Sequence, residues 1–172
     1  TPQAHIESAL AALGFADDPE MANTGSSVAR FLQDFVPGTQ PPHPTVLETA
    51  SQELIVVRDL PFYSLCAHHL LPFFGTATIA IRPNDRISGL GWFPKILRHH
   101  ARQPQLQERL AEQVASAIDA HLSPQSVGVQ LKARHMCMEM RGAEAKAAIE
   151  VLARRGQEDT DLSLALLGPE AG

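Results

Sequence analysis

Residues 126–140 read SVGVQLKARHMCMEM and contain the clearest strand pattern in the chain. Every second residue from Val127 to Ala133 is apolar, which places these side chains on one face of a half-buried strand. His135 and Cys137 continue the alternation, so both side chains are expected to point in the same direction. The stretch therefore predicts a strand whose end carries an imidazole and a thiol on one face.

The segments around this strand predict an α+β domain. Further strands are expected at 53–59 and 73–83, and helices at 3–14, 26–36, 92–102 and 105–122. The residues of 143–154 are strong helix formers. We expect 1–50 to form an N-terminal helical segment with a proline-rich loop, 51–156 the main domain, and 157–172 a flexible tail. The order of elements predicts an antiparallel sheet with helices on one face.

The composition is that of an ordinary globular domain. With 172 residues, 44% of them hydrophobic and 19% charged, the chain fits neither a disordered nor a membrane protein. The net charge is −5 and no Lys/Arg cluster is present, which argues against a nucleic-acid surface but leaves room for a nucleotide. Residues 1–10 show no secretion signal, although the first residue is not Met. We therefore expect a cytoplasmic protein that binds neither nucleic acid nor a membrane.

Two segments combine residue types that bind transition metals. Cys66-Ala67-His68-His69 offers a thiol and imidazoles in one turn, and Cys137 offers a second thiol from a distant part of the chain. Taken singly, Cys137 is more typical of a small buried side chain, and His69 of a hydrogen-bonded core histidine. Taken together, two thiolates and one imidazole favour zinc or iron. A three-ligand set leaves a fourth position for water, whose pKa a zinc ion lowers towards ~7.

Other polar residues are candidates for substrate chemistry. His68 and His135 would lie beside the metal, where an imidazole can pass protons to and from a reacting ring. Glu108 is either a solvated glutamate or an acceptor for the paired N–H groups of a guanine edge. Arg141 is either a surface arginine or a phosphate ligand. His100 is expected on an exposed helix face, without a role.

Three blocks of the chain resemble the GTP cyclohydrolase I family. They are FYSLCAHHLLPFFG (62–75), QLQERL (105–110) and HMCMEMRG (135–142), and their order and spacing match the family from about Asp17 to Gly142. The resemblance implies the tunnelling fold, a ββααββ unit plus N-terminal helices, with the sheets of several subunits closed into a barrel. It implies a homo-oligomer, usually a decamer of two pentamers, with active sites between subunits. It also implies a last strand within 146–155, which we expect because tertiary pairing often overrides local propensity.

The resemblance implies a role for each candidate residue. Zinc is held by Cys66, His69 and Cys137, the acid–base histidines are His68 and His135, and substrate is bound by Gln107, Glu108, Arg141 and Lys95. Glu108 would anchor the guanine, and Arg141 would hold phosphate. The implied reaction opens the guanine imidazole ring at C8, with His135 protonating N7. It converts GTP and water into formate and 7,8-dihydroneopterin triphosphate, a step towards pterins and tetrahydrofolate.

The sequence departs from the family pattern at several places. Ala67 stands where a glutamate is usual, Gly89-Leu90-Gly91-Trp92 replaces Gly-Leu-Ser-Lys, and Thr24-Gly25-Ser26-Ser27 lacks the arginine of Thr-Pro-x-Arg. Since these changes thin the contacts with triphosphate and ribose, two alternatives stay open. One is a paralogue that acts on a guanine nucleotide with fewer phosphates or stops at a formamidopyrimidine-type intermediate. The other is a non-catalytic oligomer that binds pterins or purines. Trp92 is expected to offer a stacking face in place of the lysine.

Overall fold

The computed structural model of the chain describes residues 1–36, 38 and 40–168. The chain divides into two compact units, Thr1–Gly38 and Thr39–Gly172. All the residues predicted to bind metal or substrate belong to the second unit. Within the described residues, no helix is long and apolar enough to cross a membrane.

In the first unit, two helices pack against each other. They are α1 (Pro2–Ala12) and α2 (Thr24–Phe35), with the 3₁₀ helix η1 (Pro19–Met21) between them in the chain. The Thr1 hydroxyl caps α1 by accepting a hydrogen bond from the Ala4 backbone N–H. Gly25 allows the helices to approach closely, because a Cβ there would lie 2.4 Å from Cγ of Glu7. Both predicted N-terminal helices are confirmed.

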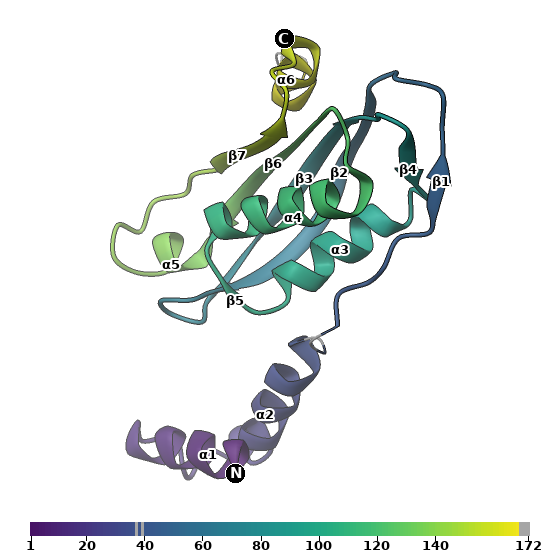
Figure 1. The fold of residues 1–172 in the computed structure, drawn as a ribbon. Helices are drawn as coiled ribbons and strands as arrows, with labels where there is room; N and C mark the ends of the chain where they lie inside the picture. The colour runs from purple at the N-terminus through teal and green to yellow at the C-terminus, as the bar shows by residue number, and fades with distance from the viewer. Residues whose placement is uncertain (37, 39, 169–172) are drawn as a thin grey trace. The chain divides into compact units, whose positions relative to one another are not determined.

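A five-stranded sheet forms the centre of the second unit (Figure 1). In spatial order its strands are β5 (Pro104–Gln105), β2 (Ile55–Cys66), β3 (Pro72–Arg82), β6 (Ser126–His135) and β7 (Ile149–Gly156). All neighbours pair antiparallel except β5 and β2, which pair parallel over two residues. A separate ladder joins β1 (Val46–Glu48) to β4 (Arg86–Ser88). The predicted antiparallel sheet is confirmed for its four long strands, and a short parallel strand is added at one edge.

Two helices, α3 (Trp92–Ala101) and α4 (Gln107–Leu122), cover one face of this sheet (Figure 1). Leu110, Val114 and Ile118 recur every fourth residue as an apolar stripe on α4, and all three are buried in one core with the sheet. Each such side chain stabilises the fold by roughly 1.5–3 kcal/mol on burial. The long elements follow the chain order β2, β3, α3, α4, β6, β7, so the expected ββααββ unit is confirmed.

Two strands differ from what local residue preferences predict. β7 forms from strong helix formers, as the resemblance implied, because it pairs with β6 along its whole length. β2 continues to Cys66 instead of ending at Asp59 as predicted. The pairing of β2 with β3 shifts between Val57 and Leu60, where Asp59 has a φ of +56°. This bulge lies at the polar residues Arg58 and Asp59, which follow the apolar run of residues 54–57 and read as the end of a strand.

The flexible tail expected after β7 was a wrong prediction, because this segment contains the helix α6 (Thr160–Leu167). Leu162 and Leu166 of α6 are buried against Ala80 of β3. Ala80 alternates along the strand with Ile79, which belongs to the core under α3 and α4. The helix α6 therefore covers part of the opposite face of the sheet.

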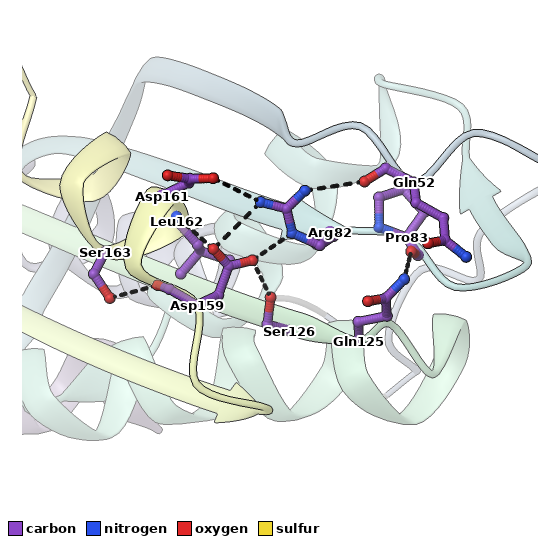
Figure 2. A network of polar contacts seen from close by, with 9 residues as sticks. All are labelled: Gln52, Arg82, Pro83, Gln125, Ser126, Asp159, Asp161, Leu162 and Ser163. Carbon is purple, nitrogen blue, oxygen red and sulfur yellow. Dashed lines mark hydrogen bonds and ion pairs between the residues drawn. The ribbon is translucent and has the colours of Figure 1, made fainter.

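Asp159 attaches the start of α6 to the sheet (Figure 2). Its carboxylate accepts hydrogen bonds from the Arg82 guanidinium at 2.5 Å, the Ser126 hydroxyl at 3.0 Å and the Leu162 backbone N–H at 2.9 Å. The last bond caps the helix. The Arg82 hydrogen bond is the largest cause of the lowered pKa of Asp159, so this carboxylate stays charged well below neutral pH. Long-range partners of this kind cannot be read from the local sequence.

Candidate metal centre

Cys66, His69 and Cys137 come together at one end of the sheet, and their ligand atoms lie within 4.8 Å of one another. Cys66 is the last residue of β2, and His69 lies in the turn that leads to β3. Cys137 lies in the short helix α5 (Met136–Glu139), which follows β6 directly. Since β3 begins beside the end of β6, the sheet brings this turn and α5 to the same place.

The turn between β2 and β3 is held by its own backbone and by β5. The Cys66 N–H donates to the carbonyl of Leu71 at 2.8 Å, and the Cys66 carbonyl accepts from the N–H of Leu70 at 2.8 Å. Leu70 has a φ of +54°, an uncommon left-handed conformation for a bulky residue, of the kind that clusters at functional turns. The Ala67 N–H donates to the Gln105 carbonyl at 3.0 Å. These contacts fix both ligands of the turn on one hairpin.

The structure corrects the predicted surroundings of Cys137. The strand predicted through residue 140 ends at His135, and Cys137 belongs to a helical turn. Arg134 and Glu139 hold this change of direction through a two-point ion pair, with N···O distances of 2.9 and 2.6 Å. Cys137 is therefore not on the strand, and the strand alternation that predicted the direction of its side chain does not apply to it. The thiol nevertheless lies with the other two predicted ligands.

The chemistry of the three side chains fits a borderline or soft divalent metal. Two sulfurs and one imidazole are donors that zinc prefers. Burial, followed by the neighbouring Cys66 thiol, raises the pKa of the Cys137 thiol, because adjacent sulfurs resist ionising together. A bound cation would relieve this repulsion by stabilising both thiolates. Among the described residues no fourth His, Cys, Asp or Glu joins the group, so a coordination position would stay open.

Two of the other predicted site residues lie at the rim of this group. Arg141 donates from Nη1 to Nε2 of His69 at 2.8 Å, so that nitrogen carries no proton in this arrangement. His68 is exposed, and its Nδ1 lies 4.0 Å from the sulfur of Cys66. A cation and an imidazole therefore stand beside the candidate metal position, open to a substrate.

His135 is held by contacts on two sides. Its ring stacks on Phe73 with centroids 4.7 Å apart and planes 5° apart, and its Nε2 lies 2.7 Å from Oε1 of Gln107. Burial lowers the pKa of His135, and the negative charge of Glu108 opposes this shift. Glu108 is exposed in the first turn of α4, within electrostatic reach of the imidazole. The imidazole of His135, two residues before Cys137, therefore has a fixed orientation and an anion, Glu108, within electrostatic reach.

The other residues expected to contact substrate lie in differing surroundings. Lys95 is exposed on α3, and in the described part of the chain it has no hydrogen bond or ion pair with the other candidates. Trp92 is only 4% exposed and its indole N–H donates to the Pro42 carbonyl at 2.7 Å. The expected stacking face is therefore wrong, because the first turn of α3 packs this ring into the core. Gln107 is 2% exposed, and its amide bonds to the backbone of Leu131 and Ile149 and to the His135 ring.

Several residues that build the site were missed in the sequence. Phe73 lies within one of the quoted blocks but reads as an ordinary core residue. Gln105 is fully buried, and its side chain bonds to the backbone of His100 and Leu106, which fixes the start of α4. A glutamine between two helices looks like surface, so no local pattern identifies it. The Arg134 ion pair described above depends on a turn that was itself missed.

Comparisons with known proteins agree with the geometry. A family model described as GTP cyclohydrolase I matches residues 2–165. A curated protein of Campylobacter jejuni named GTP cyclohydrolase 1 is 46% identical over 112 residues, which cover 64% of this chain and 59% of that protein. The chain thus spans about six-tenths of that relative's length. A protein of Lactiplantibacillus plantarum with the same name is 38% identical over 180 residues, covering 94% of this chain and 92% of the relative.

A solved structure described as an archaeosine synthase QueF-Like in the apo form has a TM-score of 0.47 and 18% sequence identity, covering 63% of this chain and 99% of that one. The family match is far broader, since it runs from the second residue of the chain into the last helix, α6. It contains the whole ββααββ unit and every residue of the candidate metal centre. This chain therefore belongs to the GTP cyclohydrolase I family.

Proposed function

We propose that this protein acts in the cytoplasm as a zinc-dependent GTP cyclohydrolase I. The reaction converts GTP and water into formate and 7,8-dihydroneopterin triphosphate by opening the guanine imidazole ring at C8. The observation that carries the proposal is the convergence of Cys66, His69 and Cys137 within 4.8 Å, with His135 held nearby and no fourth protein ligand among the described residues. The names of the relatives at 38–46% identity support the same activity.

The zinc would be held by two sulfurs and one imidazole. When bound, it supplies a Lewis acid and lowers the pKa of a coordinated water towards ~7. The chain's own groups then supply the proton transfers and the orientation of substrate. His135, in its imidazolium form, gives a proton to N7 of the guanine. The exposed His68 beside Cys66 is positioned to pass protons between the ring and solvent.

Substrate orientation falls to two charged residues on different elements. Glu108, at the start of α4, accepts hydrogen bonds from the adjacent N–H groups of the guanine edge. Arg141, which contacts His69 at the metal group, turns towards a phosphate when substrate binds. Lys95 is exposed on α3 and would contact phosphate from a neighbouring subunit.

We further propose that the chain assembles as a decamer in which sheets of neighbouring subunits pair into barrels. The strand β7 supports this, because only one of its sides is paired within the described chain. Light scattering on the purified protein is expected to give the mass of ten chains of 18.6 kDa each. A monomeric mass would contradict an active site shared between subunits.

A second candidate substrate is a guanine nucleotide with fewer phosphates. The family's serine and lysine are replaced by Gly91 and Trp92, and Trp92 is buried with its N–H bonded to Pro42. No cation therefore stands at this position to meet a triphosphate. Each lost charge-assisted contact would weaken triphosphate binding by about 1.5–3 kcal/mol.

The deciding experiment incubates zinc-loaded protein separately with GTP, GDP, GMP and guanosine. Formate release and mass spectrometry of the products are followed, with Cys137→Ala as the metal-deficient control. Dihydroneopterin triphosphate as the main product supports the first proposal. Ring-opened or pterin products from GDP or GMP alone support the second. If no purine nucleotide releases formate although one zinc is bound per chain, both proposals fail and a binding-only oligomer is favoured.

A further inference from the structure

We infer that Gln107 is a positioning residue for His135, and that it does not contact the guanine base. The inference rests on the proposed function, since it takes His135 as the acid–base group. Gln107 is the first residue of α4 and its side chain is almost completely buried. The exposed Glu108 follows it directly, about 100° further round the helix. Two adjacent polar residues thus face entirely different surroundings.

The Gln107 amide makes three hydrogen bonds to protein atoms, which use both of its N–H groups and one lone pair of its oxygen. Its nitrogen donates to the carbonyl of Leu131 on β6 at 2.9 Å and to the carbonyl of Ile149 on β7 at 2.9 Å. Both amide hydrogens are therefore used, and the amide cannot be flipped without losing both bonds. This leaves the oxygen, Oε1, facing Nε2 of His135 at 2.7 Å.

The direction of that last bond sets the tautomer of the imidazole. An amide oxygen only accepts hydrogen bonds, so Nε2 of His135 must carry the proton. Within the described residues, Nδ1 has no protein partner, which leaves it as the nitrogen that takes up and gives away a proton during the reaction. Phe73, fully buried and stacked on the same ring at 4.7 Å, fixes the plane of the imidazole. Ring plane and tautomer are thus set by two separate contacts.

Only 2% of Gln107 is exposed, so a guanine could contact its amide only if the side chain left this arrangement. At least one of the three hydrogen bonds would then be lost, and a buried carbonyl or the imidazole N–H would be left without a partner. Such a loss costs roughly 1–3 kcal/mol. Glu108 can reach a substrate from its exposed position without any comparable loss.

Two substitutions at Gln107 separate positioning from substrate binding. Gln107→Met removes the acceptor for His135, whereas Gln107→Glu keeps an acceptor oxygen but loses the two donors to Leu131 and Ile149. We expect Gln107→Met to lower kcat by about 10- to 100-fold with little change in KM. Calorimetric binding of GTP to the zinc-free protein, in which no turnover occurs, should stay within about threefold of wild type.

Gln107→Glu should recover most of the lost kcat, although it loses as many backbone hydrogen bonds as Gln107→Met. A merely structural residue would instead give two variants whose activity follows their thermal stability, and this result would overturn the inference. Glu108→Gln is the comparison variant, and it is expected to weaken GTP binding. The inference also fails if Gln107→Met weakens GTP binding about tenfold or more while kcat is unchanged.

Solid-state NMR of protein labelled with ¹⁵N-histidine supplies a readout that does not depend on activity. The His135 signals are those missing from His135→Asn. At a pH where the ring is neutral, the wild type should carry its proton on Nε2, and Gln107→Met should shift the ring towards the Nδ1–H form. An Nδ1–H form in the wild type would overturn the inference. If these signals behave as expected but neither the wild type nor any variant releases formate from GTP, the proposed function fails while the positioning role stands.

Discussion

His68 and His69 are neighbours in the chain, yet they have different surroundings. His69 belongs to the metal-ligating group and accepts a hydrogen bond from Arg141. His68 is exposed and outside that group, with its Nδ1 4.0 Å from the Cys66 sulfur. The roles proposed for these two histidines, metal ligand for His69 and proton carrier for His68, can therefore be tested separately by substituting each in turn.

We predict that His69→Asn will bind well under one zinc per chain and will lose nearly all activity. His68→Asn should keep about one zinc per chain but lose about 10²–10⁴-fold in kcat, the usual contribution of a general acid–base group. Metal analysis of the dialysed proteins, together with formate release, measures both effects. Equal zinc loss in the two variants would contradict the separation of roles.

His100 shows how burial changes the chemistry of a residue that the sequence suggested was exposed. Its side chain is half-buried, and its Nε2 is buried without a hydrogen-bond partner in the described structure. Burial, with a smaller effect from His99, lowers the pKa of His100 from 6.5 to about 4. The expectation of an exposed helix face was wrong, because His100, near the end of α3, lines a pocket together with residues of α4.

This shift predicts a pH dependence of stability. Between pH 6.5 and about 4, unfolded His100 binds a proton that folded His100 does not. Stability contributed by the neutral ring is therefore present above pH 6.5 and is lost as pH falls towards 4, on the order of 1–3 kcal/mol. Urea unfolding at several pH values should show this slope in the wild type and a flatter profile in His100→Asn. Identical slopes in the two proteins would argue against it.

At the scale of helices and strands, predictability followed the range of the interactions involved. The stripe of α4 and the alternation of β6 appear in consecutive residues, so both were found. β7 required knowledge of its partner strand, because its own residues favour a helix. The helical turn at Cys137 depends on the Arg134–Glu139 ion pair, and α6 depends on Asp159 meeting Arg82 from 77 residues away. The second of these is a tertiary contact that leaves no local pattern, and the first joins residues five positions apart, which is the spacing of neither a helix face nor a strand face.

Two leucines of α6 test how this helix is anchored. Leu166 is fully buried against the sheet, whereas Leu164 is 62% exposed on the same helix. Leu166→Ala should lower the free energy of unfolding by about 2–5 kcal/mol, because it removes a buried side chain and leaves a cavity. Leu164→Ala should change it by less than about 0.5 kcal/mol. Urea denaturation of both variants measures the difference, and similar losses would mean that α6 is not packed as described.

At the scale of the whole molecule, the candidate metal centre connects distant parts of the chain. Two candidate ligands come from the hairpin of β2 and β3, and the third comes from α5, directly after β6 and 68 residues after His69. The resemblance identified these residues, and their types predicted the metal. Their geometry could not be predicted, because it depends on the pairing of β3 with β6 and on the turn that follows.

Such a connection predicts that metal removal will destabilise the fold. A ligand that binds only the folded state adds about 4 kcal/mol at a free concentration about 1,000-fold above its Kd. Thermal unfolding should therefore begin at lower temperature after treatment with a chelator, and added zinc should restore the original midpoint at the same protein concentration. Cys137→Ala is the control, since its midpoint should respond little to either treatment. A wild-type midpoint that is insensitive to chelator would contradict the linkage.

The closeness of Cys66 and Cys137 also bears on how the purified protein ages. Their sulfur atoms lie within 4.8 Å, and a disulfide needs a separation of about 2 Å, so a small movement would join them. Metal-free protein stored in air is thus exposed to internal cross-linking, most of all at alkaline pH where thiolate is abundant. Preparations kept with zinc and a reductant should retain their free thiols. Loss of activity in a stored batch would then result from oxidation of these two thiols and not from the amino-acid sequence.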